Sequence, residues 1–184
     1  MGNAGWLIPR KRFDIFLKVA ANVAAMDAGA LFVIAGDGPD AATLKSLAVQ
    51  LRIADRVRWL AWQSDLGDFY RSLDLMLFNA DWEALGRSPL EALAAGVPVV
   101  ASVLHGGLSE ILDRENYGPI YQDHDVDRLT EAALSVLWDL TAANRLVLAG
   151  RRRLELVASP EGYADRVCQI LGDDSHHWRR WRAA

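Results

Sequence analysis

The sequence has little of what marks disulfide-rich, membrane-spanning or nucleic-acid-binding proteins. It contains one cysteine, Cys168, which excludes an intramolecular disulfide framework and a cysteine-rich zinc site. The longest apolar run is interrupted by Gly96, Pro98 and Ser102, so no run reaches the roughly 18 residues of a membrane span. The 20 Lys and Arg against 24 Asp and Glu give a net charge of −4, which argues against a basic nucleic-acid-binding face.

The first residues also lack the basic and apolar segments of a signal peptide. The 184 residues are 52% hydrophobic and 24% charged, a composition that allows a packed core and is not typical of disordered chains. We therefore expect an α/β domain in a reducing compartment, the cytoplasm.

Short apolar runs alternate with helical periodicity along the chain. Strands are predicted at residues 31–35, 57–60, 75–78 and 97–100, and helices at 11–26, 66–71, 127–138, 141–157 and 160–171, with a further helix opened by Asp40 as its N-cap. This alternation is typical of βαβ units. We expect one Rossmann-like α/β domain over residues 1–172, a parallel sheet with helices on both faces, followed by a basic aromatic tail over 173–184. Its first strand must be short or truncated, because only about five residues precede Trp6.

The loop and helix start after the third predicted strand carry the candidate chemistry. Ser88, Pro89 and Glu91 match a capping box with Ser88 as the N-cap. Gly86 permits close approach of the backbone to a ligand, and Arg87 adds a positive charge. Free amides at a helix start, at the carboxyl end of a parallel strand, bind anions. A phosphate or diphosphate site is therefore predicted here.

Two carboxylates, Glu83 and Glu91, flank this predicted anion site. Because phosphate repels carboxylates, the hydroxyl groups of a sugar or ribose are the better partners for both. Each residue also has a plainer interpretation. Taken alone, Glu91 fits a capping residue and Glu83 fits an exposed acid in a loop.

The segment that contains both glutamates resembles a family signature. Glu83 and Glu91 are separated by seven residues and followed by Ala92–Ser102, which resembles the E-x7-E signature of the group 1 family of retaining GT-B glycosyltransferases and its continuation. Other segments resemble motifs of that family in the same order: Val33–Pro39, Val57–Leu60, Leu73–Asn79, Gly106–Ile111 and Ser159–Glu161. The resemblance extends from about residue 5 to residue 170.

The resemblance implies the C-terminal, donor-binding half of a two-domain enzyme. Such an enzyme moves a hexose from a nucleoside diphosphate sugar to a hydroxyl acceptor, with retention of the anomeric configuration and without a metal or other cofactor. Glu83 is then the catalytic residue beside the transferred sugar. The residues implied in donor binding are Lys11, Gly38, Gly86, Arg87, Ser88, Glu91 and His105.

Individual roles in the donor site follow from the same resemblance. Glu91 binds the ribose hydroxyls, and Lys11 offsets the charge that develops on the leaving diphosphate. His105 is either a donor contact or an exposed loop histidine. Trp59 and Trp62 flank the strand end after which the family holds the base, so one of them is expected to stack on it.

Two departures from the family pattern put the donor site in question. Trp6 stands where the family has arginine, and Arg12 stands where it has glycine. We therefore hypothesise a weakened or rearranged donor site, in which Arg10 or Arg12 replaces the missing cation. The alternative function is a non-catalytic nucleotide-binding or interaction module on the same scaffold. Trp6 favours that alternative, and the intact pair of glutamates opposes it.

The expected partners are a nucleotide sugar and an N-terminal acceptor domain outside this sequence; no nucleic acid is expected. The chain alone should bind donor weakly and catalyse no transfer. The tail residues His176–Arg182 interleave Trp and Arg, which fits either a peripheral membrane contact of the intact enzyme or packing on the other domain. His124 has no further metal ligands at suitable spacing, and we interpret it as part of a solvated turn.

Overall fold

The computed structural model describes residues 1–112 and 117–157, and a parallel sheet is its centre. Six strands of the described residues pair in the order β3-β2-β1-β4-β5-β6, and every pair is parallel. This is the strand order of a doubly wound nucleotide-binding fold. The chain adds β2 and β3 on one side of β1, and then β4, β5 and β6 on the other side. The strands are β1 (Gly2–Ala4), β2 (Phe32–Ala35), β3 (Val57–Leu60), β4 (Met76–Glu83), β5 (Val99–Gly106) and β6 (Ile120–Tyr121).

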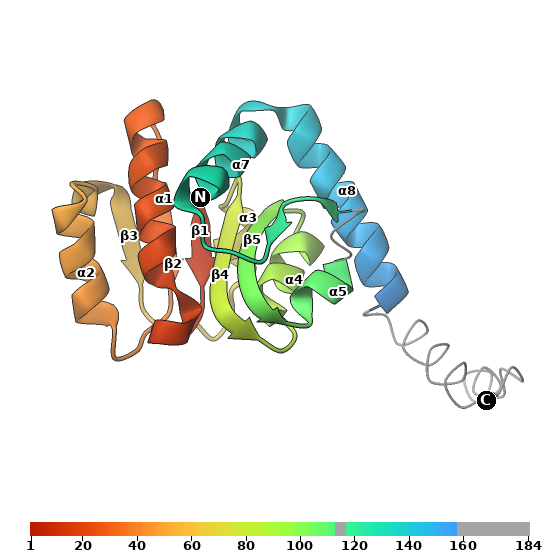
Figure 1. Cartoon of the computed structure of the whole chain (residues 1–184), viewed down its shortest axis with the longest axis horizontal. Helices are drawn as coiled ribbons and strands as arrows, with labels where there is room; N and C mark the ends of the chain where they lie inside the picture. The colour runs from red at the N-terminus through yellow and green to blue at the C-terminus, as the bar shows by residue number, and fades with distance from the viewer. Residues whose placement is uncertain (113–116, 158–184) are drawn as a thin grey trace, which may run out of the picture.

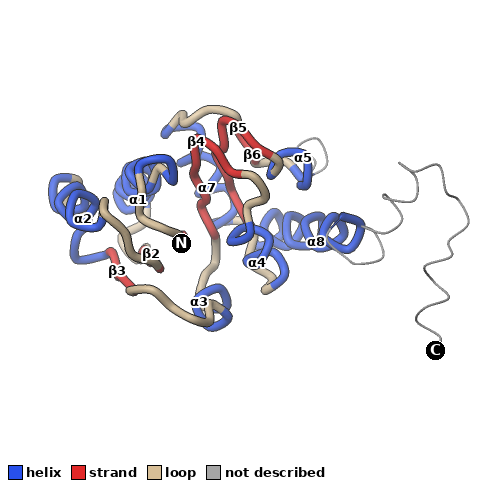
Figure 2. Tube along the Cα trace, turned by 90° about the horizontal axis from the view of Figure 1, so that it is seen from below, coloured by secondary structure: helices blue, strands red, loops and turns tan. Residues whose placement is uncertain are grey.

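Helices cover both faces of the sheet, as Figures 1 and 2 show. One face carries α1, α2 and α7, and the other carries α3, α4 and α5. Helix α8, blue in Figure 1, contacts α7 and runs along α4 and α5. The helices are η1 (Pro9–Lys11), α1 (Phe13–Met26), α2 (Ala41–Gln50), η2 (Ala54–Arg56), α3 (Gly67–Arg71), α4 (Arg87–Ala94), α5 (Leu108–Leu112), α7 (Val126–Trp138) and α8 (Leu140–Val157).

The alternation of side chains along the central strands divides the core into two layers. On β4, Leu77 packs in the layer beneath α1 and α7, whereas Met76 and Phe78 pack in the layer beneath α3, α4 and α5. All three are fully buried. A strand buried on both faces has a continuous apolar run in its sequence, and such runs are the basis of the predicted parallel sheet. The structure confirms that sheet.

The neighbouring strands β4 and β5 are longer than predicted. The sequence predicts strands at 75–78 and 97–100, but β4 continues to Glu83 and β5 begins at Val99 and continues to Gly106. Pro98 lies outside β5 because proline has no N–H for a ladder; its carbonyl accepts from the Met76 amide. The extension was missed because polar residues such as Asn79 and Ser102 end the apolar runs although both are buried.

The front of the chain confirms a short first strand and corrects the first helix. β1 has three residues. The predicted helix at 11–26 is divided, because Arg12 has left-handed backbone angles (φ 46°, ψ 42°) between η1 and α1. No single described helix is long and apolar enough to span a membrane; the α7–α8 pair, bent by 102°, meets those criteria only when its two helices are combined. The predicted helix at 160–171, Cys168 and the tail at 173–184 lie outside the described residues.

Candidate functional site

A cavity of about 680 Å³ opens at the carboxyl ends of β1, β2 and β3. The lining residues after β1 and β2 belong to glycine-rich loops, those after β3 include Trp62 and Gln63, and Ser88 at the start of α4 lies at another side. This is the place at which doubly wound sheets bind their ligands. The residues that line the cavity are Gly5, Trp6, Ala35, Gly36, Asp37, Gly38, Trp62, Gln63, Leu66 and Ser88.

The structure brings Lys11 and Glu83 together near the start of α4, although neither of the two residues lines the cavity itself. The Lys11 ammonium, at the end of η1, forms an ion pair with Glu83 Oε2 at the end of β4. The second carboxylate oxygen, Oε1, accepts a hydrogen bond from the amide of Gly86 at 3.1 Å. Gly86 is the N-cap of α4. The Glu83 carboxylate therefore links Lys11 to the start of α4, where Ser88 lines the cavity.

Burial and the lysine act in opposite directions on the acidity of Glu83. Burial raises the pKa of this carboxyl group, but the hydrogen bond and charge of Lys11, together with backbone amides, outweigh that effect. The pKa of Glu83 therefore lies below its usual value, and the group is a carboxylate at neutral pH. In this state it can accept hydrogen bonds from hydroxyl groups but cannot donate a proton.

The start of α4 differs from the predicted capping box. The N-cap is Gly86 rather than Ser88, with φ 77° and ψ 56°, and no side chain caps the helix. Glu91 instead accepts a hydrogen bond from the Tyr70 hydroxyl at 2.9 Å and pairs with Arg87 at 3.4 Å. The interpretation of Glu91 as a capping residue is wrong, and α3 orients this side chain through Tyr70.

Neighbouring protein atoms leave no room for a side chain at Gly86 or at Gly38. Gly86 has a left-handed conformation, and an added Cβ would lie 2.9 Å from Leu108 Cδ1. At Gly38 an added Cβ would lie 2.4 Å from the carbonyl oxygen of Leu7. The glycines allow the loops that form the cavity to pack against each other. That they also admit a ligand stays a prediction.

Arg10 and Arg12, the two candidates to replace a missing cation, are both engaged elsewhere. Arg12 donates to both carboxylate oxygens of Asp14, at 3.0 and 3.2 Å, and to Asp81 at 3.0 Å. The Arg10 guanidinium lies 5.7 Å from the ring centre of Trp82. Neither arginine lines the cavity, whereas Trp6 does.

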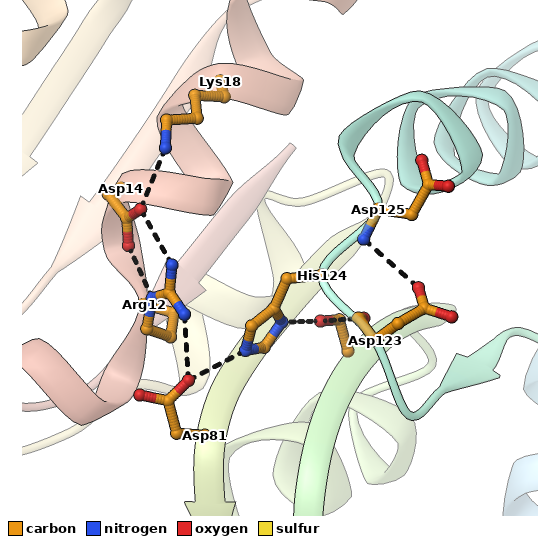
Figure 3. Close-up of polar contacts among 8 residues, drawn as sticks. Arg12, Asp14, Lys18, Asp81, Asp123, His124 and Asp125 are labelled. Atoms are coloured by element: carbon orange, nitrogen blue, oxygen red, sulfur yellow. Dashed lines mark hydrogen bonds and ion pairs between the residues drawn. The ribbon is translucent and has the colours of Figure 1, made fainter.

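The interpretation of His124 as part of a solvated turn is wrong. Only 10% of its side chain is exposed. Its Nε2 lies 3.0 Å from Asp81 Oδ1 and its Nδ1 contacts the Ser102 hydroxyl, so it joins the loop before α7 to both β4 and β5 (Figure 3). Sequence reasoning missed this contact because the three residues are far apart in the chain. Among the described residues, no group of three or more His, Cys, Asp or Glu is placed to hold a metal ion.

Of the remaining predicted site residues, only Trp62 lines the cavity. Arg87 has 83% of its side chain exposed. His105 is exposed on β5, beside Trp82 of β4, and does not line the cavity. Trp62 does line it with 73% of its surface exposed, whereas Trp59 lies under the ammonium of Lys45.

Comparison with known proteins assigns the sequence to a family. The family model "Glycosyl transferases group 1" matches residues 2–153. The lipopolysaccharide core biosynthesis glycosyltransferase LpsE of Rhizobium meliloti (strain 1021) is 29% identical over 167 residues, which cover 91% of this chain and 48% of that protein. The chain thus spans about half the length of this curated relative.

Solved structures share the fold. A variant of S. aureus TarM, in complex with Fondaparinux, alpha-GlcNAc-glycerol and UDP, superposes with a TM-score of 0.82 at 19% identity, over 92% of this chain and 34% of that chain. The C-terminal domain of the group 1 family glycosyl transferase LpcC from Francisella tularensis superposes with a TM-score of 0.75 at 18% identity, over 86% of each chain.

Proposed function

This chain belongs to the glycosyl transferases of group 1, and we propose that it is the donor-binding half of a retaining GT-B enzyme. In this proposal the whole enzyme, in the cytoplasm or at the membrane surface, moves a hexose from a nucleoside diphosphate sugar to a hydroxyl acceptor bound by an N-terminal domain, without a metal ion. The observation that carries the proposal is the cavity of about 680 Å³ between the glycine-rich strand ends and the start of α4.

The residues that line the cavity support one orientation of a bound nucleotide, with its base near the loop after β3 and its diphosphate near the start of α4. Trp62 and Gln63, after β3, offer an aromatic face and an amide for a base. The start of α4 lies at another side of the same cavity, where Ser88 and the first-turn amides of Arg87 and Ser88 suit a diphosphate. A UDP-bound structure among the fold neighbours is consistent with this arrangement.

The ion pair of Lys11 and Glu83 supports the proposed chemistry. Breaking the bond between a sugar and a diphosphate transfers negative charge to the diphosphate, and a fixed ammonium beside it stabilises that charge. Glu83 is ionised because its pKa is lowered, which makes it an acceptor for hydroxyl groups of the transferred sugar. Glu91, held by Tyr70, is the proposed acceptor for the ribose hydroxyls.

Calorimetric titration of the chain with UDP, GDP and ADP tests the proposal. We expect one of them to bind and Glu91→Gln to weaken that binding at least fivefold, because two hydroxyl hydrogen bonds to a carboxylate are lost or weakened. Glu131→Gln, an exposed residue of α7, is the matched control and should bind as the unchanged chain does. Binding of no nucleotide, or equal affinities for both variants, would contradict the proposal.

A non-catalytic nucleotide-binding module is the second candidate, and Trp6 is the observation that favours it. Trp6 lines the cavity, 61% exposed, at the place of a family arginine. The two functions differ in the sugar part of the donor. If the chain is the donor-binding half of a transferase, Glu83→Gln should lower the affinity for a nucleotide sugar more than the affinity for the matching nucleoside diphosphate. If it is a module that recognises only the nucleotide, the substitution should change both affinities equally.

A further inference from the structure

Arg12 has a backbone conformation that is typical of glycine. Among the described residues, only Arg12 (φ 46°) and Arg52 (φ 59°) combine a side chain with a positive φ. Residues with a Cβ are disfavoured in this region. The two arginines differ in their surroundings, since Arg52 is exposed whereas the Arg12 side chain is 28% exposed and enclosed by carboxylates.

The side chain of Arg12 fastens two elements to each other. Its guanidinium donates from Nε and Nη2 to Asp14 in the first turn of α1, and from Nη1 to Asp81 on β4. Figure 3 shows these carboxylates on either side of the arginine. Planar guanidinium groups that bind a carboxylate with two parallel hydrogen bonds hold a defined geometry. The end of η1 is therefore fixed against β4.

Asp81 is itself held from the other side. His124 Nε2 lies 3.0 Å from the same Oδ1 atom that accepts from Arg12. Burial raises the pKa of Asp81, but the hydrogen bonds from Arg12 and His124 outweigh that effect. The pKa of Asp81 therefore lies below its usual value. The carboxylate that anchors Arg12 is therefore ionised and has a fixed orientation.

Lys11 and Arg12 are neighbours in the chain, and their partners Glu83 and Asp81 are alternate residues of β4. The result is a ladder of two ion pairs between the end of η1 and the end of β4. We propose that Arg12 is a positioning residue, which fixes the direction of the Lys11 ammonium through Asp81 and thereby strengthens the contact of Lys11 with the donor diphosphate. This inference rests on the proposed function, and it gives Arg12 no direct contact with the donor.

The first test needs no nucleotide. The chain has three lysines, Lys11, Lys18 and Lys45, and their acylation by limiting acetic anhydride is followed by mass spectrometry, with Lys45 as the internal reference. Arg12→Gly should increase the acylation rate of Lys11 at least threefold, because the ion pair with Glu83 opens more often. Glycine suits the backbone at this position, and circular dichroism checks that the variant folds.

Arg52→Gly is the matched control, since it removes the same side chain and charge from a second left-handed residue. It should leave the acylation rate of Lys11 unchanged. Equal rates for Lys11 in Arg12→Gly and in the unchanged chain would overturn the inference, whatever the chain binds.

The second test connects Arg12 with the diphosphate. Affinities are measured by calorimetry for UDP, GDP and ADP and for their monophosphates. Arg12→Gly should lower the affinity for the bound diphosphate about fivefold and leave the monophosphate unchanged, a selectivity that general destabilisation would not produce. In a Lys11→Ala background the Arg12→Gly substitution should have no further effect, because the lysine that it positions is absent.

The outcomes distinguish failure of the positioning role of Arg12 from failure of the proposed function. An additive loss in the Lys11→Ala background, or equal losses for diphosphate and monophosphate, would contradict a positioning role. If no nucleotide binds while acylation of Lys11 still rises in Arg12→Gly, the proposed function fails and the positioning of Lys11 by Arg12 is retained.

Discussion

Gly36 offers the sharpest test of how the cavity is built. It follows β2 with φ +142°, and a Cβ added there would lie 1.9 Å from the carbonyl oxygen of Gly5, which follows β1. Real Cβ contacts essentially never lie under 3.0 Å. Because the opposing atom belongs to the backbone, Gly36→Ala must move the end of one strand away from the other.

The cost of that movement can be worked out from two contributions. An alanine at this φ adds strain of about 1–3 kcal/mol. Overpacking between two fixed backbones adds about 1–3 kcal/mol, and the hydrogen bond from the Gly5 amide to the Ala35 carbonyl (3.0 Å) is stretched. We expect Gly36→Ala to lower the free energy of unfolding by about 4 kcal/mol. For a chain of this length the melting temperature then falls by about 8–16 °C.

Urea unfolding followed by circular dichroism measures this difference. Gly29→Ala is the control, because its added Cβ would lie 3.4 Å from the flexible side chain of Asp27, and it should change the free energy of unfolding by less than about 1 kcal/mol. Because Gly36 lines the cavity, its substitution should also weaken nucleotide binding. A Gly36→Ala variant within about 0.5 kcal/mol of the unchanged chain would refute the reasoning.

Three further predictions concern the polar groups of the site. Tyr70→Phe should weaken nucleotide binding in calorimetry about threefold to tenfold, because it frees the carboxylate that α3 orients, whereas Tyr117→Phe, which removes hydrogen bonds to β5, should alter stability alone. Trp6→Arg should tighten diphosphate binding about tenfold through a charge-assisted hydrogen bond; an unchanged affinity would show that this position does not reach the phosphates. Since the pKa values of Glu83 and Asp81 are lowered on folding, their stabilisation is complete above about pH 4.5 and is lost as pH falls below it, so a urea midpoint at pH 3.5 equal to that at pH 7 would contradict these ion pairs.

The sheet could be predicted because inner strands such as β2 are apolar on both faces, and the bounds of one edge strand were also predicted. Val57–Leu60 is a strand with the predicted bounds, and the helix predicted at 127–138 differs from α7 by one residue. The ends of β4 and β5 could not be predicted. There the chain continues as paired strands through Asn79 and Ser102, whose polar side chains resemble those of a loop although both are fully buried.

The site was predictable where the sequence places its parts close together. Gly86, Ser88 and Glu91 lie within six residues, and the helix start that they share exists. The pairing of Lys11 with Glu83 joins residues separated by 72 positions, and only the parallel order of β1 and β4 brings them together. The bond from Tyr70 to Glu91 likewise depends on how α3 packs against α4, which no local spacing encodes.

The charges around the site are already balanced before a ligand binds. Lys11 faces Glu83 and Arg12 faces Asp81, so a diphosphate cannot gain the full attraction of Lys11 unless Glu83 takes another partner. In the proposed function the hydroxyl groups of the sugar are that partner. A nucleoside diphosphate without a sugar must share Lys11 with Glu83, so it gains only part of the attraction of the lysine, in addition to that of the amides at the start of α4. The ion pair thus connects recognition of the sugar with stabilisation of the diphosphate, and the lysine acts at full strength only on a complete donor.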